Sequence, residues 1–177
     1  MKSTQVYKAT REVIAPWCKE NSFKRTSGGM LGWYKAVDEK FIVFWFQCSQ
    51  DGWNDYAGSS FCVEFQFSDS PHTGGGHADD RKRLPHFLSG TDLQEVRHKQ
   101  NSVIAKLVCP PKDYYIFQMD NSVVDWYLNR FLRVKLAYTE KQDIWFRYKE
   151  EEDIVMWAEF VLERLPTILA QITASSG

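Results

Sequence analysis

Two runs of large apolar residues constrain the fold of this chain more than any other feature. The first, FIVFWF, covers residues 41–46 and is apolar at every position, while the second, FCVEFQF, covers residues 61–67 and alternates apolar with polar residues. A continuous apolar run is typical of a strand covered on both faces, and alternation is typical of a strand with one covered face. The pair therefore predicts an interior strand beside a half-covered strand, with Cys62, Glu64 and Gln66 facing water or a shallow cover.

Segments with helical spacing flank these strands. Apolar residues recur at intervals of three and four over residues 4–19, over residues 91–107 and over residues 150–174. This spacing places them on one face of a helix. We expect Pro16 to kink or end the first helix near Ala15, because proline lacks an amide donor. Ser89 or Thr91 is expected to cap the second helix.

Shorter elements complete the expected fold. Two strands around Gly28 and Gly29 are expected before the FIVFWF strand, and RKRLPHFL is expected to form a short turn. Residues 113–119 are ambiguous, Asn121 or Ser122 is expected to cap a helix through residue 134, and residues 143–149 suggest one more strand. The prediction is a single α+β domain over residues 1–177. In it, an antiparallel meander sheet of four to five strands packs against N-terminal, central and C-terminal helices.

Composition narrows the class of protein. The chain is 44% hydrophobic and 15% aromatic, which favours a large core over intrinsic disorder. Its formal net charge of −1 provides no overall attraction to nucleic acid or to an anionic membrane, and neither partner is expected. No apolar run approaches the roughly 20 residues that span a bilayer, and the start lacks the apolar segment of a secretory signal. The four widely spaced cysteines then suggest reduced thiols and a cytoplasmic location.

Motifs for known catalytic chemistry are not found in the sequence. There is no P-loop, dinucleotide fingerprint, nucleophile elbow or H-E-x-x-H pattern. Each cysteine lies in or near an apolar stretch, where a thiol has a raised pKa and is inert. Glu64 and Gln66 are interpreted as ordinary strand positions, and Arg81, Lys82 and Arg83 as a solvated basic triplet that could otherwise meet a phosphate or an acidic partner. The expectation is a domain without catalysis and without a cofactor.

A glycine-rich loop, SDSPHTGGGHADD over residues 68–80, contains the best candidates for metal ligands. His72, His77 and Asp79 are suitable ligand types. The glycines at 74–76 are expected to make the loop mobile, whereas a catalytic metal needs rigid geometry. We interpret the loop as solvated and keep these three residues only as outside candidates.

The loop DGWNDY, residues 51–56, is the most suggestive segment for recognition. Asp51, Trp53, Asp55 and Tyr56 combine aromatic and acidic side chains between two predicted strands. Aromatic residues surrounded by charge are typical anchors of protein interfaces. These four residues are predicted to contact a protein partner, and the alternative is that Trp53 folds back over the end of the sheet.

The order of these features resembles a bacterial family known as domain of unknown function 4304. The resemblance rests on APWCKENSFKRTSGGMLGWYK, on the strands FIVFWFQCSQ and FCVEFQF, on RKRLPHFL before a helix, and on Leu165–Pro166 in the last helix. It covers most of the first 110 residues, and the motifs that carry it are structural. The family has no established activity, so the resemblance implies no functional residue.

Two functions are weighed on this basis. The first is a non-catalytic bacterial partner-binding domain, of which the immunity proteins that neutralise a cognate toxin are one kind. The second is a small-molecule-binding or metal-dependent hydrolase domain. Its pocket would lie between the sheet and the helices and would be lined by Trp33, Trp45 and Phe65, with His72, His77 and Asp79 on a lid.

Overall fold

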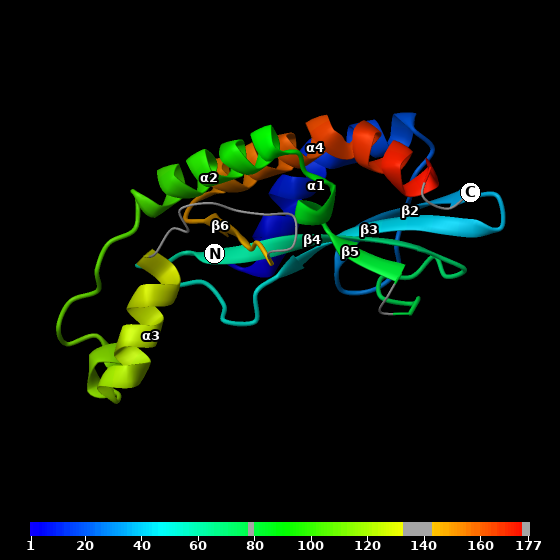
Figure 1. Cartoon of the computed structure of the whole chain (residues 1–177). Helices are drawn as coiled ribbons and strands as arrows, with labels where there is room; N and C mark the ends of the chain where they lie inside the picture. Colours follow the sequence, from blue (N-terminus) through cyan, green and yellow to red (C-terminus); the bar gives the residue numbers. More distant parts are fainter. Residues whose placement is uncertain (78–79, 133–142, 175–177) are drawn as a thin grey trace.

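The computed structural model describes residues 1–77, 80–132 and 143–174, and Figure 1 shows their arrangement. The described chain contains α-helices, 3-10 helices (η) and strands, in the order α1 (Ser3–Glu20), β1 (Lys24–Arg25), β2 (Leu31–Val37), β3 (Lys40–Cys48), β4 (Ser59–Ser68), β5 (Arg81–Arg83), η2 (Leu84–Phe87), α2 (Gly90–Ile104), η3 (Tyr115–Gln118), α3 (Asn121–Leu132), β6 (Phe146–Tyr148) and α4 (Glu151–Ala174). The α+β class predicted from the sequence is confirmed.

The strands form one antiparallel sheet in the order β1-β2-β3-β4-β5, which confirms the predicted meander. The FIVFWF segment lies in β3, an interior strand between β2 and β4. Strand β4 is long enough to pair with two partners along the same edge. Its residues Glu64–Gln66 pair with β5, and its residues Ser59–Phe61 pair with β6. The last strand therefore joins the sheet beside the point where β5 ends.

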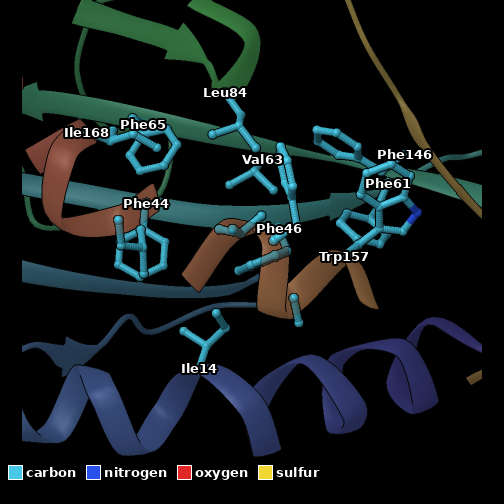
Figure 2. Packing of buried hydrophobic residues seen from close by; sticks show 14 of the residues in the cluster. Ile14, Phe44, Phe46, Phe61, Val63, Phe65, Leu84, Phe146, Trp157 and Ile168 are labelled. Atoms are coloured by element: carbon cyan, nitrogen blue, oxygen red, sulfur yellow. The ribbon is translucent and has the colours of Figure 1, made fainter. Parts of the chain in front are cut away.

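One face of the sheet carries the main core, and helices α1, α2 and α4 lie over it (Figure 1). The rings of Trp33, Phe44 and Phe65 stack across three neighbouring strands, with centroids 5.4 Å and 5.8 Å apart. Figure 2 shows Ile14 of α1 pointing towards the sheet and Trp157 of α4 beside Phe61 and Phe146, and all of these belong to the main core. Burying a side chain of this size contributes about 1.5–3 kcal/mol, so this face dominates the stability of the fold.

The opposite face of β4 is covered as well, and the prediction that Cys62, Glu64 and Gln66 face water or a shallow cover is wrong. Their exposed fractions are 1%, 8% and 1%. The chain after β4 turns back, so that the Gln66 amide donates to the Ser68 hydroxyl at 2.7 Å. Arg83 of β5 lies across Glu64 and donates to its carboxylate at 3.0 Å. Hydrogen-bonded polar groups can be buried without a large free-energy cost, which is why the alternating pattern did not indicate exposure.

Three local expectations also need correction. Pro16 does not end α1, which continues to Glu20 because Cys18 is buried and Trp17 packs on Phe23. The RKR part of RKRLPHFL forms strand β5 and the rest a 3-10 helix, and η3 lies within the ambiguous residues 113–119. Helix α3 is capped by Asp120, whose carboxylate accepts the Ser122 amide at 2.8 Å. Residue 134, the predicted end of that helix, lies outside the described residues.

Helices α2 and α4 are joined by ion pairs. Ser89 caps α2 as predicted, with a reciprocal pair of hydrogen bonds to Asp92. The Arg164 guanidinium of α4 donates to Asp92 at 2.9 Å. Burial raises the pKa of Asp92, but the hydrogen bonds from Ser89 and Arg164 lower it by more, so the pKa of this carboxyl lies below its usual value. Lys106 donates to the buried Asp153 of α4 at 2.7 Å.

Among the described residues, no helix is long and apolar enough to cross a bilayer.

Candidate protein-binding surface

Trp53, in the predicted recognition loop, folds back onto the main body. Its indole N–H donates to the Lys149 carbonyl at 3.2 Å, and the Lys149 ammonium lies 5.2 Å from its ring centroid. The ring is half-buried and packs against the main core. Trp53 therefore folds back, as in the alternative stated for it, and is not an exposed anchor. Its neighbours Asp51 and Asp55 are exposed.

Asn54 organises the rest of this loop. Its side-chain carbonyl accepts the amides of Tyr56 and Ala57 at 3.0 Å and 2.7 Å, which forms a tight turn. Its amide group donates to the Tyr127 hydroxyl of α3 at 3.0 Å. The Tyr56 ring meets the Tyr114 ring edge to face, with centroids 4.8 Å apart. The loop is thus joined to a segment that lies more than 50 residues later in the chain.

That segment, residues 108–132, is here called the arm. It contains η3 and α3 and extends away from the sheet at one end of the molecule (Figure 1). A second hydrophobic cluster holds the arm to the loop. Its buried members are Ala57, Ile116 and Tyr127, and half-buried side chains surround them: Tyr114, Phe117, Val123 and Leu128. Burial and the neighbouring Tyr115 hydroxyl raise the pKa of Tyr114 to about 12, so the Tyr114 phenol is neutral at physiological pH.

Exposed apolar side chains are concentrated on the arm. In the part of the chain that the structure describes, the large apolar residues with high exposure are Val108, Tyr115, Met119 and Trp126, at 56%, 57%, 50% and 53%. All of them fall within 19 consecutive residues of a 177-residue chain. Single exposed apolar residues are common on protein surfaces, whereas in the described residues those of large size and high exposure are all on the arm.

The charge of this region is acidic. The arm and the loop at residues 51–58 together contain five aspartates, against one lysine and one arginine. Asp55 lies near enough to the N-terminal ammonium to act on it, although burial has the larger effect and lowers the pKa of that amine. We call eight side chains of the loop and the arm the arm surface: the exposed Asp51, Asp55, Asp113, Tyr115, Met119, Asp120 and Asp125, and the half-buried Tyr56.

The outside metal candidates do not form a cluster in the described residues. His72 Nδ1 lies 3.4 Å from the Ser27 hydroxyl, and the His77 amide donates to the Asp80 carboxylate at 3.1 Å. Asp79 lies outside the described residues. Across residues 1–77, 80–132 and 143–174, no group of three histidine, cysteine or acidic residues has the geometry of a metal site.

In residues 68–77 of the glycine-rich loop, the backbone passes close to neighbouring serine side chains, although His72, Gly74, Gly75 and His77 are exposed. A Cβ atom placed on Gly75 would lie 2.2 Å from the Ser70 hydroxyl, and one on Gly76 would lie 2.8 Å from Ser68. The Gly75 amide donates to the His72 carbonyl at 3.0 Å. Glycines at these two positions allow a close approach of the backbone to neighbouring side chains, and their presence does not imply a disordered loop.

The pocket predicted between the sheet and the helices does not have the predicted lining. Trp33 and Phe65 pack into the stacked layer of the core, whereas Trp45 pairs with Glu64 on the opposite face of the sheet. Successive residues of a strand point to opposite faces, so Trp45 cannot share a pocket with Trp33, whose partner in the register is Phe44. The prediction of a pocket lined by all three residues is wrong.

The cysteine thiols lie in two kinds of surroundings. Burial raises the pKa of Cys18 and of Cys62 to about 12, and the pKa of Cys48 to about 11. A thiol with a raised pKa is a poor nucleophile at neutral pH, as the sequence predicted for the buried cysteines. Cys109, at the start of the arm, is exposed, so the prediction of apolar surroundings for each cysteine is wrong for this one.

Sequence reasoning identified the loop but missed the arm. The signal was present in YYIFQM, residues 114–119, which is rich in large apolar residues but has neither helical nor strand periodicity. Such a segment has no regular face to bury.

Comparison of the chain with family models, with curated proteins and with solved structures gives no significant match.

Proposed function

We propose that this chain is a non-catalytic protein-binding domain that recognises a partner through the arm surface. The observation that carries the proposal is the concentration of exposed apolar side chains on the arm, next to the acidic loop at residues 51–58. Asp51, Asp55 and Tyr56 would contact the partner together with Tyr115 and Met119. Trp53, which is bonded to Lys149, would position the loop.

The chemistry of the arm surface favours a partner with a basic face. Tyrosine and methionine are enriched in the cores of protein interfaces, and charged residues surround them at the rim. The aspartates of the arm surface would attract lysine and arginine side chains and accelerate encounter. An immunity-like role, in which the basic partner is a toxin, is a narrower form of this proposal. The resemblance to domain of unknown function 4304 implies no activity and does not enter it.

The proposal is tested by affinity capture from the native host with a matched pair of variants. The double variant Tyr115→Ser with Met119→Ser removes exposed apolar side chains from the arm. The control, Lys8→Ala with Glu12→Ala, removes an exposed ion pair from α1. We expect a specific protein to bind the wild type and the control, and to be lost or weakened at least tenfold, or about 1.4 kcal/mol, with the double variant.

Salt dependence gives a second measurement on the captured partner. Exposed charges are screened over about 8 Å at physiological ionic strength, so raising the salt concentration should weaken binding. The variant Asp55→Asn should reduce the association rate more than it raises the dissociation rate. A partner that binds the double variant as well as the wild type would contradict the proposal.

A further inference from the structure

A separate apolar groove lies at the opposite end of the molecule from the arm. There the C-terminal ends of α1 and α4 meet the hairpin of β2 and β3 (Figure 1). The groove has a volume of about 330 Å³, and ten residues from these elements line it: Trp17, Asn21, Phe23, Lys35, Val37, Ile42, Pro166, Leu169, Ala170 and Thr173. This volume is at the lower end of the range for small-molecule sites.

A sharp reversal of the chain after α1 builds the floor of the groove. Ser22 adopts a positive φ of 64°, and the Phe23 amide then donates back to the Cys18 carbonyl at 2.8 Å. This turn places the Phe23 ring beside Trp17, with centroids 5.8 Å apart. Phe23 and Ile42 are 7% and 3% exposed, so the floor is firmly packed. The groove is therefore held by ordered strands and helices.

The lining contains one charged side chain, that of Lys35. Its ammonium lies 5.8 Å from the centroid of the Phe23 ring, above the apolar floor. Among the described residues, no carboxylate lies within ion-pair distance of Lys35. Two polar side chains of the lining have partners within or next to their own helix: the Asn21 amide donates to the Trp17 carbonyl, and the Thr173 hydroxyl donates to carbonyls of α4.

We propose that this groove binds a small amphipathic carboxylate, with its hydrocarbon chain against Phe23, Ile42 and Leu169 and its carboxylate on Lys35. An apolar lining with a single cation matches a ligand with an apolar body and one negative charge. Each methylene group removed from water contributes about 0.8 kcal/mol. The inference does not depend on the arm surface, because the two sites share no residue.

The test is titration of the full chain with decanoate, measured by isothermal titration calorimetry. We expect saturable binding with one site per chain. Ala170 is exposed on α4, so Ala170→Trp should fold normally and fill the groove, which should abolish binding. Lys35→Met keeps the apolar stem and removes the charge, and it should weaken decanoate binding about tenfold, or about 1.4 kcal/mol. The control Lys8→Met removes an exposed lysine of α1 and should leave binding unchanged.

A neutral analogue separates the two parts of the proposal. Decanol should bind the wild type and Lys35→Met equally, since it carries no charge for the lysine to meet. Circular dichroism of each variant verifies that the helices are retained, and Thr173→Phe, also at an exposed position, provides a second way to fill the groove.

Three results would overturn the inference. They are the lack of saturable decanoate binding to the wild type, decanoate binding that survives both groove-filling variants, and decanoate binding that Lys35→Met does not weaken. Dimerisation in size-exclusion chromatography that Ala170→Trp abolishes would also overturn it, because a second copy would then occupy the groove. Loss of partner capture by the arm variants leaves this test unaffected.

Discussion

The sheet with its three covering helices and the arm are stabilised in different ways. The main body has a continuous core that joins α1, α4, η2 and four strands, including fully buried rings such as Phe44 and Trp157. The cluster that holds the arm has three buried residues, Ile116 and Tyr127 of the arm and Ala57 of the loop, and the arm exposes other large apolar side chains. The body buries its large apolar residues for stability, whereas the arm leaves several of them available for contact.

The difference has consequences for dynamics. A helix of 12 residues such as α3 is marginal in water without tertiary contacts. The arm is held by a small cluster and by the hydrogen bond between Asn54 and Tyr127. Segments with few buried contacts open locally with low free energies, while the core opens with the whole protein. We therefore expect the arm to open and close while the body stays folded.

The largest effect is expected from a cavity in the body. Phe44→Ala removes a ring that stacks between Trp33 and Phe65 and is fully buried. The expected loss is about 3–5 kcal/mol in the free energy of unfolding. Urea titration followed by circular dichroism measures it. A loss below about 1 kcal/mol would show that this layer does not dominate stability.

Alkaline pH should also destabilise the body. Burial raises the pKa of Cys18 and Cys62 from 9.0 to about 12, so the unfolded state loses these thiol protons at lower pH than the folded state. Their contribution is fully present below about pH 9 and is lost as the pH rises towards 12. Urea midpoints measured across this window should fall.

A double variant sharpens the alkaline comparison. Cys18→Ala with Cys62→Ala removes the two thiols whose pKa is raised to about 12 and leaves Cys48, whose pKa is raised to about 11. The urea midpoint should then fall less steeply with pH. An unchanged slope would assign the alkaline loss to other groups, such as the buried Tyr148, whose pKa burial raises to about 12.

A smaller effect is expected from the same kind of truncation in the arm. Ile116→Ala removes a buried side chain of the second cluster. Because the arm opens separately, the free energy of unfolding of the body, measured by urea titration, should change by less than about 1 kcal/mol. Hydrogen exchange should instead accelerate in residues 114–128 and stay unchanged in β3. Loss of protection in β3 would show that the arm and the body unfold as one unit.

The smallest effect on stability is expected at Cys109, at the start of the arm. This thiol is exposed, while Cys18 and Cys62 are buried. A thiol reagent at neutral pH should label Cys109 quickly and should reach Cys18 and Cys62 only after urea is added. Cys109→Ser should remove the fast phase without changing the urea midpoint. A fast phase that persists in this variant would mean that a body thiol is accessible.

Regular periodicity explains most of what could be predicted. The apolar run in β3 and the helical spacing of α1, α2 and α4 recur at fixed intervals, so the fold class and the meander followed from them. Strand β5 has no such period. Its three basic residues pair with β4 because Arg83 meets Glu64, and that partner is 19 residues away in the chain. Of the candidate site, the loop at residues 51–56 was predicted and its neighbour η3 was not.

The sequence by itself determined which regularly spaced apolar residues of β3, α1, α2 and α4 face the core, because an apolar period specifies a face regardless of what covers it. Only the tertiary structure decided which residues from distant segments contact one another. It placed Asn54 against Tyr127, folded Trp53 onto Lys149, and put Phe23 and Lys35 beside the end of α4. These contacts depend on the angle at which distant segments leave the sheet. No local pattern encodes that angle, since it follows from the packing of the whole core.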